Sequence, residues 1–314
     1  MIFLKLTLIT ACILTIGLIL EEIILYLQKK RLTYPGHLIK TSNGNIHVVS
    51  KGDGDTTIVF ASSLGITSPY CDFFSLQDKI SNFSKTALYE KYGYGFSPDI
   101  YTNVSLDNLV HDIRFSLKEC GHTPPYIFLC HSMASVEILR YAELFPSEVK
   151  GIIMDDAFNP EFKDKLKLPS IAHIRIATFF KYTGFYRLVT KFPYIKKKTI
   201  GNIPSKDLRH LKSRLHVRNY YNEYMIKELK QFSANCSLIL RNGINLKNIP
   251  LYIITAGNRK AFSKDFNKAW FQSQEEMLSW SKKSSQVVVK NADHFIHYYD
   301  EEILINAVKE IIKA

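Results

Sequence analysis

A serine at position 132 lies at the junction of an apolar run and a helix-like run. The stretch CHSMAS at 130–135 follows YIFL and precedes VEILRYAEL. A sharp turn from strand to helix holds a serine hydroxyl clear of the sheet, and it requires small residues two positions before and after the serine. Cys130 and Ala134 meet this requirement, and the amide of Met133 would face an oxyanion formed at the serine. The pattern alone is equally typical of a buried serine that caps a helix.

A nucleophilic serine also needs a base, and the C-terminal region supplies one. The segment KNADHFIHYYDEE at 290–302 puts His294 just after the last expected strand and before the terminal helix. A histidine after the final strand is what a serine on a strand-turn-helix junction requires. His297 is the competing histidine, and because it lies three residues further from the strand we expect it to pack or to cap.

These residues need a scaffold, and the chain alternates short β-rich runs with longer helix-like runs. The run SLDNLVHDIRFSLKE at 105–119 has its apolar residues on one helical face and Ser105 as its N-cap. Such alternation predicts a mostly parallel sheet covered by helices on both faces. The expected strands are 45–49, 56–61, 85–91, 126–130, 149–155, 250–256 and 285–290.

One long stretch, residues 158–248, shows no strand pattern, and we call it the insert. It is too long for a loop and is expected to form a helical subdomain. It holds 19 Lys and Arg against 5 Asp and Glu, an excess of 14 that is larger than the net charge of +12 of the whole chain. The basic character therefore belongs to the insert. Its aromatic residues are expected either to line an apolar pocket or to pack the insert on the core: Phe179, Phe180, Tyr182, Phe185, Tyr186, Tyr220, Tyr221 and Tyr224.

The N-terminal segment is apolar enough to enter a membrane. Residues 6–20 carry no charge, and residues 6–27 together are long enough to cross a bilayer. Glu21 and Glu22 are costly there unless they lie near the interface. Because no small-x-small site follows, we expect an uncleaved single-pass anchor in the cell membrane rather than a signal peptide. A KKR run at 29–31 follows the segment and one lysine precedes it, which favours a cytoplasmic domain without deciding the side.

Composition excludes several other classes of protein. The hydrophobic and charged fractions, 46% and 22%, are those of an ordinary globular chain. The five cysteines are odd in number and widely spaced without a CxxC pair, so neither a zinc site nor a disulfide framework is expected. The positive charge comes without a recognised nucleic-acid motif, so no nucleic-acid partner is expected.

Four motifs, in the correct order, resemble those of the α/β-hydrolase superfamily, and especially its bacterial esterases and proline iminopeptidase-like members. The similarity runs from about Asn45 to Ala314. The four segments are VFASSLG (59–65), similar to the oxyanion loop; YEKYGYGFSP (89–98), similar to the "YDRxGxGxS" loop; PYIFLCHSMASVEILRYAELFPSEVKGIIMDDA (125–157), similar to the nucleophile elbow with its following helix and strand; and NADHFIH (291–297), similar to the "SGHxIH" histidine loop.

The resemblance implies an α/β-hydrolase fold with a helical cap inserted after the sixth strand. The chain would then divide into an N-terminal transmembrane anchor at 1–30, a first part of the core at 31–157, a basic helical cap at 158–248 and a second part of the core at 249–314.

The resemblance also implies roles for individual residues. The oxyanion donors would be the backbone N–H groups of Leu64 and Met133. Asp156 in GIIMDDAFNP would be the acid that orients His294, because related sequences read "VLVDSxHP" there. Asp265, after the seventh expected strand, is the alternative acid.

The sequence departs from the family pattern at four positions that are usually glycine. Cys130, Ala134 and Ser135 stand in the elbow, and Ser63 stands in the oxyanion loop. The larger side chains would narrow the pocket without removing the amides.

The implied function is a serine hydrolase of carboxylic esters, including lipid-like acyl esters, that acts through a Ser132–His294–Asp156 triad and an acyl-enzyme. No metal or organic cofactor is implied. The alternatives are an aminopeptidase, amidase or acyltransferase on the same fold, or a catalytically silent membrane-associated binding module. We expect the partners to be a small-molecule or lipid-like substrate and the membrane, which would be contacted by the N-terminal helix and by the basic cap.

Overall fold

The structure is a computed structural model that describes residues 1–31, 33–201, 203, 205–260 and 262–313. The side chains of residues 29, 31, 197 and 198 lie outside this description, and with them most of the KKR run that follows the apolar N-terminal segment.

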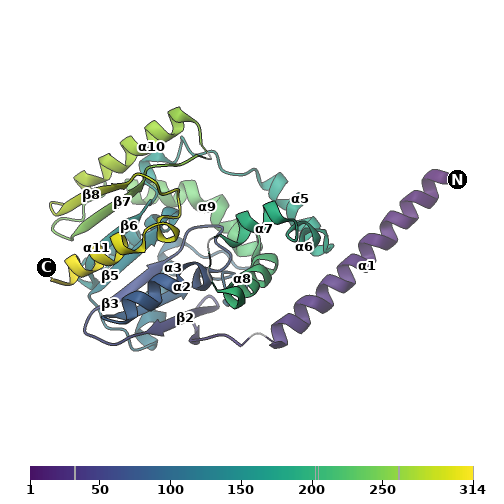
Figure 1. Cartoon of the computed structure of the whole chain (residues 1–314), viewed down its shortest axis with the longest axis horizontal. Helices are drawn as coiled ribbons and strands as arrows, with labels where there is room; N and C mark the ends of the chain where they lie inside the picture. Colours follow the sequence, from purple (N-terminus) through teal and green to yellow (C-terminus); the bar gives the residue numbers. More distant parts are fainter. Residues whose placement is uncertain (32, 202, 204, 261, 314) are drawn as a thin grey trace.

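An eight-stranded sheet forms the centre of the described chain, with the strand order β1-β2-β4-β3-β5-β6-β7-β8 (Figure 1). The pairs β1–β2 and β2–β4 are antiparallel, and all later pairs are parallel. The expected mostly parallel sheet is therefore confirmed. The strands are β1 (His37–Lys40), β2 (Asn45–Lys51), β3 (Thr57–Ala61), β4 (Lys85–Glu90), β5 (Tyr126–His131), β6 (Val149–Asp155), β7 (Leu251–Ala256) and β8 (Ser284–Val289).

The seven expected strands are all present, and β1 is the one that the sequence did not predict. Its four residues, HLIK, are mostly exposed at the edge of the sheet. A short edge strand without an apolar run carries no periodic signal, and only its pairing with β2 identifies it.

Helices cover both faces of the sheet, because successive apolar side chains of a strand point to opposite faces and both faces must be buried. Val59 and Phe128 belong to the core on one face, where α3 (Leu106–Glu119), α4 (Ser135–Leu144) and α10 (Lys264–Glu276) pack. Ile58 and Ile127, their immediate neighbours in sequence, belong to the core on the other face, under α2 (Pro69–Ser81) and α11 (Glu301–Lys313). The Ser105 side chain accepts a hydrogen bond from the Asn108 N–H and caps α3 as predicted.

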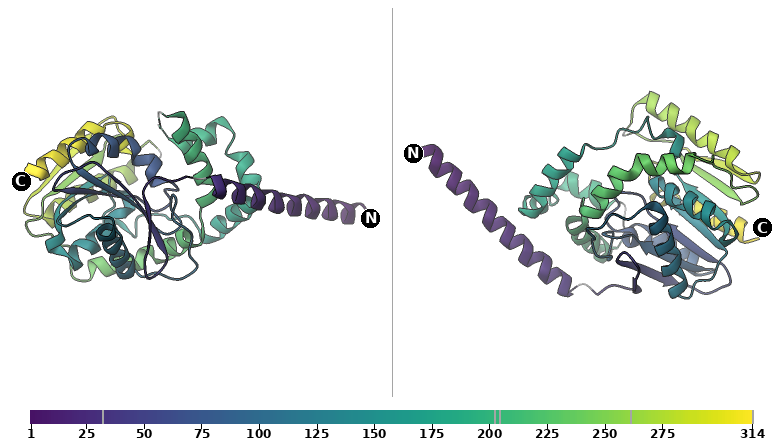
Figure 2. Two further views of the ribbon diagram at one scale, coloured as in Figure 1. Left: turned by 90° about the horizontal axis from the view of Figure 1, so that it is seen from below. Right: turned by 180° about the vertical axis from the view of Figure 1, so that it is seen from behind.

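The insert between β6 and β7 is helical in its described residues and lies between the sheet and the N-terminal helix (Figure 2). Ser170, Ser205 and Asn222 each accept a backbone hydrogen bond at the start of a helix. The helices are α5 (Ile171–Tyr182), α6 (Phe185–Val189), α7 (Pro193–Ile200), α8 (Lys206–Asn219) and α9 (Glu223–Leu240).

The N-terminal helix α1 (Ile2–Arg31) projects beyond the rest of the molecule (Figure 1). Residues Ile2–Gln28 form the one helix in the described part of the chain that is long and apolar enough to cross a membrane. Its large apolar side chains are exposed over most of this length.

Candidate active site

Ser132 lies directly after β5, at the start of a short 3-10 helix (Ser132–Ala134) that continues into α4. Its backbone has φ = 53°, a left-handed conformation that is uncommon for a residue with a side chain. Strain of this kind is typical of a nucleophile elbow, because the turn lifts the hydroxyl above the sheet. Cys130 and Ala134 are completely buried on either side, so small residues are indeed needed there.

The structure brings Ser132, His294 and Asp156 together in one chain of hydrogen bonds. His294 Nε2 lies 2.9 Å from Ser132 Oγ, and His294 Nδ1 lies 2.6 Å from Asp156 Oδ2. A carboxylate beside Nδ1 keeps the proton on that nitrogen, which leaves Nε2 free to accept the serine proton. Residues from 138 to 162 positions apart in the sequence thus meet in the geometry of a general base and its nucleophile.

Asp156 follows β6 and is fully buried. Besides His294, its carboxylate accepts hydrogen bonds from the Ala256 N–H and the Trp270 indole N–H, each at 3.1 Å, and from Arg259 at 2.8 Å. Burial raises the pKa of this carboxyl, but the hydrogen bond to His294 and the charge of Arg259 outweigh it, so the pKa is lowered overall. Asp156 is therefore held as an anion beside the histidine.

Arg259 is a site residue that the sequence reasoning missed. It lies after β7, in the segment that leads to the alternative acid Asp265, and its guanidinium lies 3.9 Å from the centre of the Trp270 ring. The available signal was a basic residue three positions after a buried strand. Asp265 is exposed in the first turn of α10, behind the N-cap Ser263, so the structure does not bring it to His294.

The residues expected to bind an oxyanion lie at the contact between the loop after β3 and the elbow. The Met133 N–H donates to Ser63 Oγ at 3.4 Å, and Leu64 follows Ser63 in the loop. The Gly65 N–H donates a hydrogen bond to the Tyr94 hydroxyl oxygen at 3.1 Å. An oxyanion bound to Met133 would therefore replace or join the hydroxyl of Ser63, one of the residues that departs from the usual glycine.

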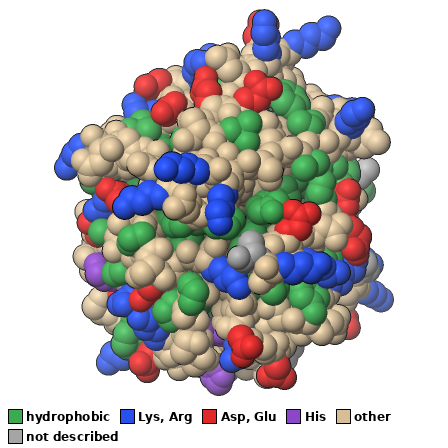
Figure 3. Space-filling view, turned by 90° about the vertical axis from the view of Figure 1, so that its left-hand side faces the viewer, with side chains coloured by type: hydrophobic (Ala, Val, Ile, Leu, Met, Phe, Trp, Pro, Cys, Tyr) green, Lys and Arg blue, Asp and Glu red, His purple; other side chains and the backbone are tan. Residues whose placement is uncertain are grey.

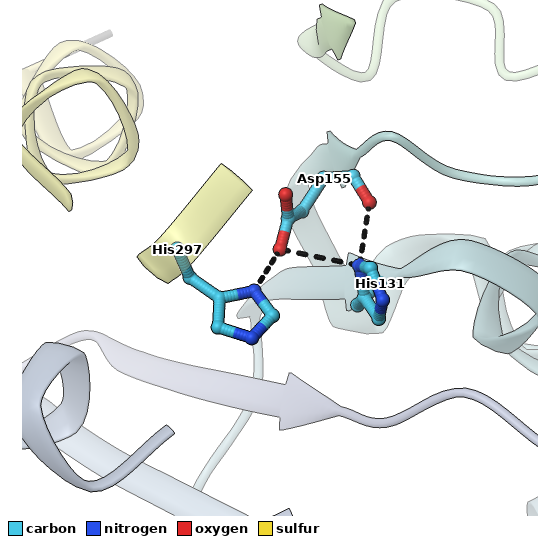
Figure 4. A group of neighbouring side chains, drawn as sticks. All are labelled: His131, Asp155 and His297. Carbon is cyan, nitrogen blue, oxygen red and sulfur yellow. Dashed lines mark hydrogen bonds and ion pairs between the residues drawn. The ribbon is translucent and has the colours of Figure 1, made fainter. Parts of the chain in front are cut away.

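A second buried cluster, His131, Asp155 and His297, lies beside these residues (Figure 4). His297 Nδ1 lies 2.6 Å from Asp155 Oδ2, and His131 Nδ1 lies 3.0 Å from the backbone oxygen of Asp155. Burial raises the pKa of Asp155, but the two histidines outweigh it, so the pKa is lowered overall. The His131 ring packs against the ring of His294 at 4.7 Å between centroids. His297 packs against the ring of His131 and pairs with Asp155, whereas the imidazole that meets Ser132 is that of His294.

The same three side chains offer nitrogen and oxygen atoms that all lie within 4.8 Å of one another, which raises the question of a metal site. An ion with bonds of about 2.0 Å in tetrahedral geometry keeps its ligand atoms roughly 3.3 Å apart. The 2.6 Å between His297 and Asp155 is a hydrogen-bond distance instead. The geometry fits a hydrogen-bonded support for His294 better than a metal centre.

A cavity of about 670 Å³ lies between the loops of this site and the insert. Gly65 contributes from the loop after β3, and Asp293 and Phe295 contribute from the two sides of His294. Tyr194 of α7 and His216 of α8 close the opposite side. A ligand in this cavity would have the loop after β3 and the histidine loop on one side and the insert on the other.

Comparison with known proteins assigns the fold. No protein-family model matches the chain. It is 27% identical to the uncharacterised protein YbdG of Bacillus subtilis over 254 residues, which cover 74% of this chain and 77% of that protein. An epoxide hydrolase from Bacillus megaterium superposes with a TM-score of 0.65 at 16% identity, covering 88% of this chain and all of that chain. A deformylase from Pseudomonas putida superposes with a TM-score of 0.61 at 17% identity, covering 87% of this chain and 99% of that one. The chain has the α/β-hydrolase fold.

The titration of His294 leads to a first prediction. Burial lowers the pKa of His294, and His131 and the charge of Arg259 lower it further. Asp156 raises it, but the pKa lies overall below the ordinary value of 6.5. Only neutral His294 accepts the serine proton. The rate at which a fluorophosphonate labels Ser132 should therefore rise with pH along a limb whose midpoint lies below pH 6.5. A midpoint above pH 7 would contradict this environment for the histidine.

A second prediction concerns Arg259 as a positioning residue. Its positive charge contributes to the lowered pKa of His294. Arg259→Gln should therefore shift the acid limb of the labelling profile to higher pH, besides slowing the reaction. Arg241→Gln, at an exposed arginine that ends α9, is the matched control and should leave the profile unchanged. Slower labelling with an unshifted limb would mean that Arg259 has only a structural role.

Proposed function

We propose that this protein is a membrane-anchored serine hydrolase that cleaves carboxylic esters. One observation carries the proposal, namely the unbroken chain from Ser132 Oγ through His294 to Asp156, at 2.9 and 2.6 Å, on a serine with positive φ. The solved structures that share the fold include an epoxide hydrolase and a deformylase, so hydrolysis is a chemistry that this fold supports in other proteins.

In the proposed reaction, Ser132 Oγ attacks the ester carbonyl while His294 Nε2 takes the hydroxyl proton. The carbonyl π electrons move onto the oxygen, and the amides of Met133 and Leu64 stabilise this oxyanion. The intermediate collapses, the C–O bond to the alcohol breaks, and His294 returns the proton to the leaving oxygen. Water, deprotonated by His294, then attacks the acyl-enzyme, releases the acid and restores Ser132.

Asp156 would stay ionised throughout, since its lowered pKa disfavours protonation. Its role is to keep His294 in one tautomer and to stabilise the imidazolium that forms. Arg259 and Trp270 would keep the carboxylate itself in place.

The cavity beside His294 offers apolar side chains to an acyl group. Ile66, Phe295 and Tyr299 suit an apolar acyl chain, and the charged residues Asp72, Lys212 and Asp293 also line the cavity. We propose residues 1–30 as the membrane anchor and the insert, 158–248, as the cap that covers this cavity. Amide cleavage or acyl transfer would use the same residues and differ only in the leaving group or the acceptor, so a substrate panel separates them.

The nucleophile assignment predicts that Ser132→Ala abolishes fluorophosphonate labelling and ester hydrolysis, because no other residue would form the acyl-enzyme. His294→Ala should reduce both by several orders of magnitude. Ser237→Ala, at an exposed position in α9, is the control and should label like the parent protein. Full labelling of Ser132→Ala would refute the assignment.

The acid assignment predicts that Asp156→Asn lowers kcat by about 10⁴-fold, because an amide favours the wrong histidine tautomer. Asp265→Asn should have little effect, since Asp265 is exposed in the first turn of α10. Ester hydrolysis measured for the two variants side by side tests the assignment, and the opposite ranking would refute it.

A further inference from the structure

The insert exposes an apolar surface that packing does not explain. Six large hydrophobic residues of α5, α6 and the turn before α7 have between 39% and 64% of their surface exposed, and we call them the apolar face: Ile176, Phe179, Phe180, Phe185, Leu188 and Phe192. Three of the aromatic residues expected to line an apolar pocket or to pack on the core, Phe179, Phe180 and Phe185, thus lie outside. Exposed apolar side chains that cluster in this way mark a site of interaction with a partner or a membrane.

The opposite end of the molecule has a different character. Hydrophobic side chains there are interspersed with Lys, Arg, Asp and Glu (Figure 3). Phe83, between α2 and β4, is an isolated example with 39% of its surface exposed. The apolar face of the insert contrasts with this mixed surface.

The apolar face adjoins the candidate membrane span. Arg187 of α6 makes two hydrogen bonds to the carboxylate of Glu21, at 2.5 and 2.8 Å, and Glu21 is only 3% exposed. Next to this pair, Gly17 lies so close to α5 that a Cβ there would meet the Thr183 carbonyl oxygen at 2.3 Å. Helix α1 and the insert thus pack side by side (Figures 1 and 2). The exposed apolar side chains of α1 and the apolar face therefore belong to helices that contact each other.

The position of the contact along α1 sets the depth of the insert. The segment from Ile2 to Leu20 precedes Glu21 and has Lys5, near its start, as its one charged residue. At 1.5 Å per residue it is about 28 Å long, close to the roughly 30 Å of a bilayer core. Glu21 then falls at the membrane interface, where its pairing with Arg187 makes a carboxylate tolerable. The apolar face lies at the same level, which is where amphipathic surfaces enter a bilayer by roughly 5–10 Å.

A cationic pocket of about 650 Å³ opens beside the apolar face. Arg187 lines it as well as contacting α1. The buried Nε of Arg214 has no hydrogen-bond partner among the described residues. The other cationic or titratable residues of the lining are Lys191, Lys196, Lys206, Arg209 and His210. A pocket of this charge at the level of the interface matches the phosphate of an anionic phospholipid.

We propose that the apolar face is seated in the bilayer beside α1 and that the cationic pocket binds the headgroup of an anionic phospholipid. Tyr194 of α7 is 67% exposed, lines the cavity beside His294 and lies two residues after Phe192 of the apolar face, so this seating would bring one wall of the cavity close to the lipid phase. The proposal rests on the membrane anchor of the proposed function but not on ester hydrolysis.

The seating is tested with the full chain reconstituted in phosphatidylcholine vesicles whose acyl chains are brominated, because bromine quenches a nearby indole. Phe192→Trp should add fluorescence that brominated lipid quenches. Phe83→Trp is the matched control at the other end of the molecule and should add fluorescence that is not quenched. The two native tryptophans, Trp270 and Trp280, are buried and provide the background, measured in the parent protein. Equal quenching of the two introduced tryptophans, or none, overturns the seating.

The headgroup site is tested with Phe192→Trp as the reporter. At equal bromine content, brominated phosphatidylglycerol should quench several-fold more than brominated phosphatidylcholine, and salt should reduce the difference. Adding Lys196→Gln and Lys206→Gln should remove the preference, whereas the exposed pair Lys268→Gln and Lys282→Gln should preserve it. Equal quenching by the two lipids, or the same loss with both pairs, overturns the headgroup site.

Fluorophosphonate labelling of the protein in the same vesicles distinguishes a failure of the membrane proposal from a failure of the proposed hydrolase activity. Ser132→Ala should abolish labelling and leave the quenching pattern intact. If Phe192→Trp is quenched but Ser132 is not labelled, the hydrolase proposal is refuted and the membrane proposal stands. If Ser132 is labelled but Phe192→Trp is not quenched, the membrane proposal is refuted and the hydrolase proposal stands.

Discussion

The buried carboxylate of Asp156 is the interaction on which the rest of the site depends. A charge without solvent must be fully paired, and its partners come from the end of β7, the segment after it, α10 and the histidine loop. All of these elements follow the insert in the sequence, whereas Asp156 precedes it. The carboxylate therefore joins the two parts of the core across the insert and sets the orientation of His294 in the same step.

The two adjacent aspartates after Met154 contact different histidines. Asp156 adopts φ = 41° and turns toward His294, while Asp155, the last residue of β6, contacts His131 and His297. The ring of His131 lies against that of His294, so the second cluster supports the imidazole from behind. One change of backbone direction thus supplies both the carboxylate that pairs with His294 and the cluster that packs against the His294 ring.

The insert separates two kinds of surface. Its inner side closes the cavity beside His294 through Tyr194 and His216, and its outer side carries the apolar face against α1. The pair formed by the buried Glu21 and the partly exposed Arg187 joins these features to the N-terminal helix. The glutamate that looked costly within an apolar segment is neutralised by the basic insert, which gives part of the excess charge a physical role.

The sequence by itself determined what periodicity and local spacing encode. Seven strands, the capped helix α3, the helical insert and the strand-turn-helix position of Ser132 all follow from patterns within about 15 residues. It could not identify β1, because a four-residue edge strand has no pattern of its own. It left the choice between Asp156 and Asp265 to a resemblance, and it missed Arg259. Those contacts join residues about 100 or more positions apart, and only the packing of β6 against β7 decides which side chains share a buried space. The same limit holds for the apolar face, because composition counts aromatic residues while only the tertiary structure decides which of them point away from the core.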